Sequence, residues 1–335
     1  MCGLTRARWK LSPTFVIVMT IFIDITGYGM IIPLLPFYSE TFQAGSTALG
    51  VLLSSFFIMQ FIFAPILGRI SDNVGRKPIL LLSILTSTIS FILFTLANSF
   101  ILLLLSRIIA GVATETAVAQ AYIADITKER ERARGIGRVG AAHGAGFIIG
   151  PAIGGLLSVY GFWAPGLVAV LLTILNLLFV SIFLPESIEQ NEYAKQTALG
   201  SDSSYLRKVF STLTKPLIGV VLITFFIVFF AFSAIPVIVP LLGITFFGFG
   251  TVEMSYFFMY IGVIQIISQG FLIGGLADRF GEERLIAIGP LLMMFGIFLM
   301  PLTPILIVFL VSLTMSAFGN GLMRTRVPSF ISKKT

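Results

Sequence analysis

Three ionisable residues stand inside long apolar runs of the chain, and they are the residues with the clearest capacity for chemistry. Asp24 lies in the run at 14–37, and Arg107 and Glu115 lie in the run at 100–123. An ionisable side chain within a membrane is costly, so each is expected to be functional. A carboxylate that moves between dry and wet surroundings, or toward a cation, takes up or releases a proton. We therefore expect proton coupling or substrate contact here.

Other kinds of chemistry are poorly supported by the sequence. The single cysteine, Cys2, excludes an intrachain disulfide, and the single histidine, His143, has no Cys or second His beside it for a metal. We expect His143 to be an ordinary polar residue near a helix end. The chain has no phosphate-binding loop of the Gly-x-x-x-x-Gly-Lys-[Ser/Thr] type, which disfavours an ATP-driven pump. The sequence predicts no enzyme activity, cofactor or metal.

The elements that hold these residues are predicted to be membrane-spanning helices. The chain of 335 residues is 57% hydrophobic, with a mean hydropathy of +1.02. Runs of about 20 apolar residues, enough to cross a bilayer, occur at 14–37, 48–67, 78–97, 100–123, 136–159, 164–184, 216–241, 252–274, 284–301 and 303–323. The first run is too long for a signal peptide and contains Asp24. We predict an all-α polytopic protein of about ten helices, surrounded by lipid.

The basic residues predict the orientation of these spans. With ten spans, every Lys and Arg of the 22 in the chain falls on one side, except Arg107. Basic residues stay cytoplasmic, so both termini are expected in the cytoplasm of a cell-membrane protein. The net charge of +7 is explained by these loops and requires no nucleic-acid partner.

Two turns share the pattern Gly-x-x-x-Asp-x-x-Gly and indicate two similar halves. They are "GRISDNVGRK" (68–77) and "GGLADRFGEER" (274–284). The glycines favour tight turns, and the aspartates could bind helix N-termini or arginines. The expected gating residues of the turns are Gly68, Asp72, Gly75, Arg76, Asp278 and Gly281. The predicted domains are a six-helix bundle (1–184), a polar cytoplasmic linker (185–215) and an incomplete bundle of about four helices (216–335).

Three motifs resemble those of the major facilitator superfamily, in its drug/proton antiporter branch. The first is the turn at 68–77, and the second is "LSRIIAG", with Arg107 and Gly111. The third is "GFIIGPAIGG", which matches the antiporter motif at Gly146, Gly150, Pro151, Gly154 and Gly155. The stretch "DITGYGMIIPLLP" in the first span also resembles the start of tetracycline/proton antiporters. Ordinary helix packing could explain the glycines, but in the family this motif accompanies antiport.

The resemblance implies proton-driven export of a small amphiphilic compound or drug by alternating access. Ionisable groups in the first half and Phe, Met and amide groups in the second suit an amphiphilic substrate, cationic compounds included. Family members have twelve spans, so two are expected to be missing. The alternative is a truncated, non-transporting remnant, or one piece of a split transporter completed by a second chain. In the family the Asp72 position meets helix 11, which is absent here, whereas Asp278 would keep its partners Arg134 and Arg138.

The resemblance also suggests roles for single residues. Helices 1 and 4 border the central cavity in the family, and the estimated depths of Asp24 and Arg107 agree, so we expect a pair, direct or through water. Its role is either proton coupling or static charge cancellation. Glu115 is a second proton acceptor or a cytoplasmic-side relay, or it is a side chain that only reaches water. We expect Asp125 to pair with Arg134 or Arg138 in a gating network. The weaker cavity candidates in the second half are Gln265, Gln269 and Asn320.

Overall fold

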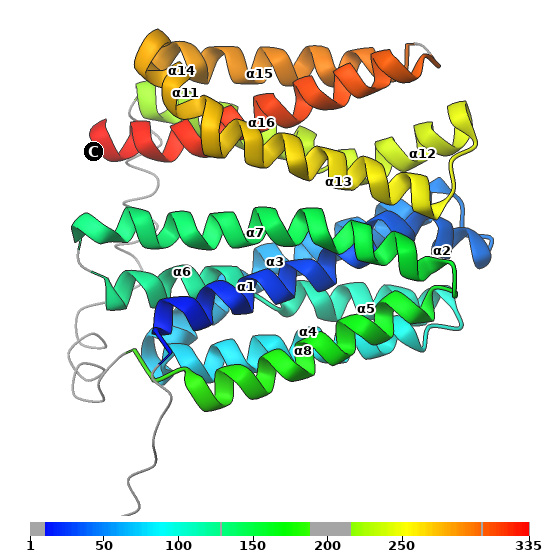
Figure 1. Cartoon of the computed structure of the whole chain (residues 1–335), viewed down its shortest axis with the longest axis horizontal. Helices are drawn as coiled ribbons and strands as arrows, with labels where there is room; N and C mark the ends of the chain where they lie inside the picture. The colour runs from blue at the N-terminus through cyan, green and yellow to red at the C-terminus, as the bar shows by residue number, and fades with distance from the viewer. Residues whose placement is uncertain (1–10, 128, 188–215, 303, 335) are drawn as a thin grey trace, which may run out of the picture. The chain divides into compact units, whose positions relative to one another are not determined.

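The structure is a computed structural model that describes residues 11–127, 129–187, 216–302 and 304–334 (Figure 1). The described part consists of helices and turns and contains no strand. Its first elements are α1 (Pro13–Ile31), the 3-10 turn η1 (Ile32–Leu34), α2 (Leu35–Thr41), α3 (Ser46–Val74), α4 (Arg76–Thr95), α5 (Phe100–Val112), α6 (Glu115–Ile126), α7 (Glu129–Ser158) and α8 (Trp163–Phe183). They are followed by α11 (Pro216–Phe232), α12 (Ile235–Phe247), α13 (Thr251–Ile267), the π-helical turn η2 (Ser268–Leu272), α14 (Ile273–Phe280), α15 (Glu282–Leu299) and α16 (Leu306–Lys334).

Eight helical stretches of the described part are long and apolar enough to cross a membrane. Three combine consecutive elements: Pro13–Thr41, Phe100–Ile126 and Gly219–Phe247. The expected runs at 252–274 and 284–301 correspond to α13, with 17 residues, and α15, with 18, which fall outside these eight. The all-helical, multi-pass class is confirmed, whereas the count of ten spans and the cytoplasmic termini remain predictions.

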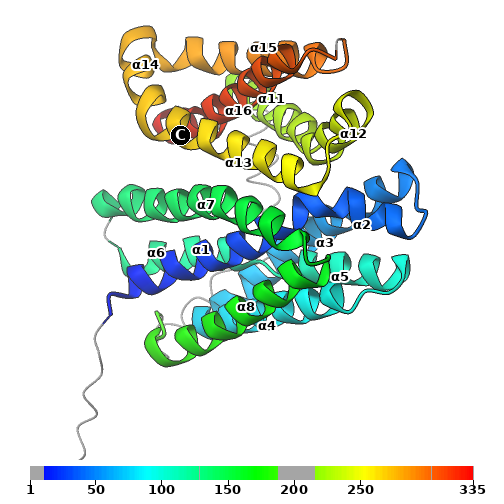
Figure 2. The ribbon, with the colours of Figure 1, turned by 45° about the vertical axis from the view of Figure 1, so that its right-hand side comes forward.

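The described residues form two compact units, and the first includes residues 11–28, 50–127, 129–146 and 160–187. Within it, α4 packs against α5, α6 and α8, and both views show α4 beside α5 and α8 (Figures 1 and 2). Buried polar groups join these helices, as is usual in membrane bundles. The Ser90 hydroxyl of α4 donates to the Ser106 carbonyl of α5 at 2.9 Å, and the Asn176 amide of α8 donates to the Thr20 carbonyl of α1 at 3.4 Å.

The second unit includes residues 29–49, 147–159, 216–302 and 304–334. Here α16 packs against α15, α11 and α13, and the hydroxyls of Tyr260 and Thr314 lie 2.6 Å apart between α13 and α16. The predicted linker at 185–215 lies outside the described residues from 188 onward. The division into bundles at 1–184 and 216–335 stays a prediction.

The glycines expected to form the antiporter motif lie where α7 meets other helices. A Cβ on Gly146 would lie 2.9 Å from the Phe22 carbonyl oxygen of α1. A Cβ on Gly154 would overlap the backbone of Met30, and one on Gly155 would meet the Ser255 side chain of α13. Gly150 is buried, and Pro151 lies inside the continuous helix α7. Close approach through small residues is thus a property of this motif.

The turn between α3 and α4 has the conformation that its glycine predicts. Gly75 has a φ of 115°, and Gly281 in the similar turn has a φ of 82°, both in the region that favours glycine. A Cβ on Gly68 would meet open space, so that glycine has no packing requirement here. Gly75 allows α4 to begin directly after α3 ends.

Arg76 is the centre of an ionic cluster at this turn. Its guanidinium lies 2.6 Å from the Asp72 carboxylate and 2.8 Å from that of Asp125 in α6, and it donates to the Ser71 hydroxyl at 2.7 Å. The expectation that Asp125 pairs with Arg134 or Arg138 was wrong: among the described residues both arginines are exposed and Asp125 binds Arg76. The physical reason is that Arg76 is largely buried and lies at the start of a helix that packs against α6.

Asp72 therefore has an arginine partner in its own turn, which is one of the two kinds of partner that the sequence suggested for it. The side chain of Asp278 lies outside the described side chains. The expected difference between these two aspartates in controlling the conformational equilibrium stays a prediction.

Glu186, which follows the last helix of the first unit, is a functional residue of this turn that the sequence did not indicate. Its carboxylate accepts the backbone N–H groups of Arg76 at 2.9 Å and Lys77 at 3.1 Å. The first N–H groups of a helix have no acceptor within the helix itself. The N-cap residue of α4, Gly75, has no side chain that could accept from them. A carboxylate from a distant segment thus replaces the missing cap and ties the end of α8 to the turn.

We expect Gly154→Leu to lower the stability of the protein by about 1–3 kcal/mol, because its side chain would overlap the backbone of α1. The matched control is Gly140→Leu in the same helix, where a Cβ would meet open space. Thermal unfolding in detergent measures both. Equal melting temperatures for the two variants would contradict the close approach of α7 and α1.

We expect Glu186→Ala to destabilise the first unit by about 1 kcal/mol, the usual effect of losing a helix cap. Glu186→Gln, which keeps one acceptor oxygen without the charge, should lie between the variant and the parent. Glu40→Ala, at an exposed glutamate of α2, is the control and should leave the melting temperature unchanged. No difference between Glu186→Ala and Glu40→Ala would show that the cap has no energetic role.

Candidate functional site

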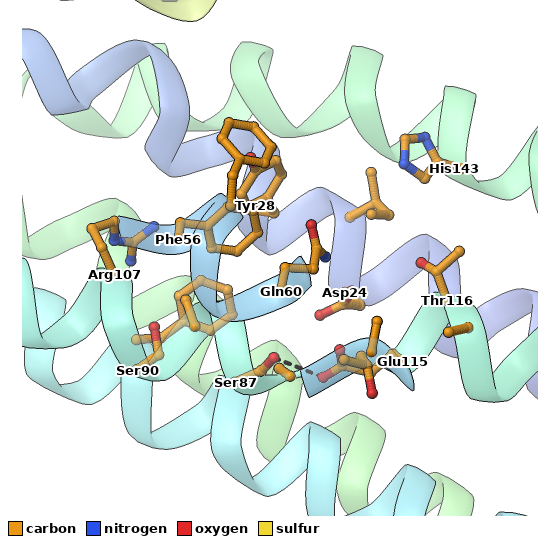
Figure 3. A pocket seen from close by; sticks show the side chains of 18 of the residues that line it. Asp24, Tyr28, Phe56, Gln60, Ser87, Ser90, Arg107, Glu115, Thr116 and His143 are labelled. Carbon is orange, nitrogen blue, oxygen red and sulfur yellow. Dashed lines mark hydrogen bonds between the residues drawn. The ribbon is translucent and has the colours of Figure 1, made fainter. Parts of the chain in front are cut away.

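A cavity of about 400 Å³ lies within the first unit, between α1, α3, α4, α5, α6 and α7 (Figure 3). Asp24, Arg107 and Glu115, the three residues singled out by their position in apolar runs, all line it. This volume falls in the range of small-molecule sites, which combine apolar walls with a few polar groups. The structure thus brings Asp24, Arg107 and Glu115 to one cavity, and their roles in proton coupling or substrate contact stay predictions.

Both acidic residues lie at one end of the cavity, next to Ser87 of α4 (Figure 3). The Ser87 hydroxyl donates to Oε1 of Glu115 at 2.7 Å. Glu115 is 4% exposed, and Asp24 from α1 is its electrostatic neighbour. Two carboxylates from different helices therefore share a small, sheltered volume, where charge repulsion between them is strong.

Glu115 reaches this place because the fourth expected span is broken. The sequence predicted one continuous helix at 100–123, but α5 ends at Val112 and α6 begins at Glu115. Ala113 is extended, with φ −69° and ψ 128°, and Thr114 has φ −132° and ψ 38°. Non-helical backbone at membrane depth is tolerated where it lines a cavity, and Ala113 and Thr114 both line this one.

Arg107 stands at the other end of the cavity and is only 1% exposed (Figure 3). Its Nε donates to the Ser106 hydroxyl at 3.2 Å, and its guanidinium lies 5.5 Å from the centre of the Phe94 ring. Its Nη2 is buried without a hydrogen-bond partner among the described residues. The close approach of α5 to α3 that brings it here depends on Gly111, where a Cβ would overlap the Phe56 carbonyl.

Asp24 and Arg107 share the cavity but do not touch. Among the described residues, no ion pair joins them, so the direct form of the expected pair is not observed. Tyr28 and Phe56 lie between the charged ends, with ring centres 5.0 Å apart in a stacked arrangement (Figure 3). The two charges are separated by an aromatic wall instead of cancelling each other.

Several cavity residues were missed in the sequence. Gln60 and Ser87 are polar residues within apolar runs, and their placement there was a usable signal. His143 was expected to be an ordinary polar residue, yet it lines the cavity. Tyr28 could not have been distinguished from the many other aromatic residues by sequence alone.

The candidates from the second half do not line this cavity. Gln265 is 9% exposed in α13, Gln269 belongs to the π-helical turn η2, and Asn320 is 1% exposed in α16. The Asn320 side-chain oxygen is buried without a partner among the described residues. Their assignment to a substrate site stays a prediction.

Comparison with known proteins places this geometry in a family. A model described as Major Facilitator Superfamily matches residues 17–335. The "Tetracycline resistance protein, class E" of Escherichia coli is 35% identical over 287 residues, which cover 84% of this chain and 70% of the relative. "Multidrug resistance protein 2" of Bacillus subtilis (strain 168) is 29% identical over 275 residues, covering 81% of this chain and 68% of the relative.

Solved structures agree at the level of the fold. The human organic anion transporter MFSD10 (TETRAN) aligns with a TM-score of 0.68 and 23% identity, covering 95% of this chain and 85% of that protein. A bacterial homolog of the human lysosomal transporter Spinster, in an inward-facing and occupied conformation, aligns with a TM-score of 0.72 and 19% identity, covering 94% and 72%. From the family match, the identity to the resistance proteins and the shared fold, the chain belongs to the major facilitator superfamily, in its drug/proton antiporter branch.

Proposed function

We propose that the protein exports a small amphiphilic compound in exchange for protons, by alternating access. The observation that carries the proposal is the presence of two carboxylates, Asp24 and Glu115, in one cavity of drug size between membrane-spanning helices. The relatives reported above are named as tetracycline and multidrug resistance proteins, which favours export. No enzymatic reaction is proposed.

The carboxylate end of the cavity would carry the proton. Two ionised carboxylates in one sheltered volume repel each other, so a proton on either one stabilises the empty cavity. Substrate that enters and changes the solvation of these groups would release that proton. The Ser87 hydroxyl can serve both states, because it can donate to an ionised Glu115 and accept from a protonated one.

The ionic cluster at the turn would gate the cytoplasmic side. Arg76 joins the ends of α3, α4 and α6 through Asp72 and Asp125, so a movement of α6 must break or carry this cluster. Discrete ionic contacts of this kind give a two-state element that substrate and proton can bias. The proposed gating set is Gly68, Asp72, Gly75, Arg76, Asp125, Arg134, Asp278 and Gly281.

A non-transporting remnant is the less favoured alternative. A protein without transport would have no need for two carboxylates and an arginine in a cavity, since each carries a cost inside a membrane. All three line one cavity within a single compact unit. This arrangement favours an active transporter.

We expect Asp24→Asn and Glu115→Gln each to abolish substrate-driven proton movement, because each removes one of two interacting proton sites. The full chain is reconstituted in liposomes with an imposed pH gradient, and a pH-sensitive dye reports dissipation of the gradient when tetracycline or tetraphenylphosphonium is added. The parent protein should dissipate the gradient with at least one of these probes.

The control for this experiment is Glu40→Gln, which neutralises an exposed glutamate of α2 and should behave like the parent. A parent protein that leaves the gradient intact with both probes would refute their proton-coupled export. If Asp24→Asn and Glu115→Gln still dissipate the pH gradient, the proton-binding site lies at other residues. The double variant Asp24→Asn with Arg107→Gln tests the pair, and unchanged transport would remove both residues from the mechanism.

A further inference from the structure

The positive charge of Arg107 has no counter-charge in the part of the chain that the structure describes. Its side chain is 1% exposed, and no carboxylate lies within ion-pair distance of it among the described residues. Nε meets only the Ser106 hydroxyl at 3.2 Å, and that hydroxyl already donates to the Leu103 carbonyl at 2.6 Å. Nη2 is buried without any acceptor among the described residues. A buried guanidinium in this condition has both a charge and a donor available for a partner.

The acidic residues of the cavity are too distant to be that partner. Among the described residues no ion pair joins Arg107 to either carboxylate, and Figure 3 shows Arg107 at the opposite end of the cavity from Glu115. Glu115 is engaged with Ser87, and Asp24 lies with it at the far end of the cavity (Figure 3). The cavity therefore has a cationic end and an anionic end.

The wall beside Arg107 is aromatic. The Phe94 ring lies under the guanidinium, with 5.5 Å between the guanidinium carbon and the ring centre, and Tyr28 stacks on Phe56 at 5.0 Å. Of these rings Tyr28 and Phe56 line the cavity, together with Phe91, whereas Phe94 is fully buried behind the guanidinium. A planar conjugated ring packs well on such a wall, and an oxygen anion attached to that ring would lie within reach of Arg107. Arginine is the residue best suited to binding carboxylate-like groups, through parallel N–H donors.

We propose that Arg107 binds the ionised acidic oxygen of the transported compound, and that the substrates are planar aromatic or conjugated acids such as carboxylates, enolates and phenolates. The inference rests on the proposed function, since it names the substrate class of the same cavity. It differs from the expectation of cationic substrates, which would be repelled at this end. The carboxylate end remains free for the proton or for a second, cationic group of a dipolar substrate.

The test is equilibrium binding of three probes that share one ring system and differ only in charge. They are 2-naphthoate, 2-naphthamide and 2-naphthylmethylammonium, titrated by calorimetry into the full chain in detergent, with empty micelles subtracted. We expect the parent to bind 2-naphthoate at least about 30-fold more tightly than 2-naphthamide, the ratio given by a desolvated charge pair. Arg107→Gln should abolish that ratio, and Arg107→Lys should keep a part of it.

The matched control is Arg284→Gln, which removes the same kind of cation at an exposed position of α15 and should leave all three affinities unchanged. If Arg107→Gln does not fold, the ranking of the probes by the parent and by Arg107→Lys decides the question. A parent that binds the amide or the ammonium compound as tightly as the acid overturns the inference, as does an acid preference that survives in Arg107→Gln.

The experiments distinguish a failure of the proposed substrate class from a failure of the proposed proton-coupled export. Proton-coupled export without preference for the acid would overturn the substrate class and leave the export function standing. Selective binding of 2-naphthoate without dissipation of a pH gradient by any of the tested probes, 2-naphthoate included, would overturn proton coupling and leave the role of Arg107 in place.

Discussion

A charge inside a membrane bundle must be paired, hydrated or used, and this constraint governs the first compact unit. Arg76 is paired, because it lies between Asp72 and Asp125 at the end of two helices. Asp24, Glu115 and Arg107 are not paired with one another, and they are tolerated because all three line a cavity. The separation of the charges into two ends is what gives the cavity its polarity.

The helices that enclose this cavity are positioned by small residues and by polar contacts more than by apolar surface. Lipid is as apolar as the helix surfaces, so burial alone does not hold membrane helices together. Gly111 lets α5 approach α3, and Gly146 lets α7 approach α1. The Ser90–Ser106 and Asn176–Thr20 hydrogen bonds then join α4 to α5 and α8 to α1. The placement of the functional side chains therefore depends on residues with almost no side chain of their own.

The class of the protein and the core of its site could be predicted from the sequence, because both follow from the cost of charge in lipid. Asp24, Arg107 and Glu115 are recognisable as ionisable residues among apolar neighbours. The turn glycines Gly75 and Gly281 indicate positive φ angles, which both have. The distant partner of Arg76, Asp125, could not be predicted, since a helix end has several acidic neighbours in space and only packing selects among them. The capping role of Glu186 could not be predicted for a similar reason, because the helix that it caps begins 110 residues away in the chain. The break at Ala113 and Thr114 was missed as well, although Gly111 stands two residues before it in the last turn of α5.

That break divides the fourth span into two helical segments, α5 and α6. A continuous helix is a stiff rod, so any tilt of Asp125 at one end would displace Arg107 at the other. With two non-helical residues between α5 and α6, Glu115 and Asp125 belong to one helical segment, and Arg107, over the Phe94 ring, belongs to the other. The acidic end of the cavity and the ionic cluster at the turn therefore share the helix α6, whereas the arginine end of the cavity belongs to α5.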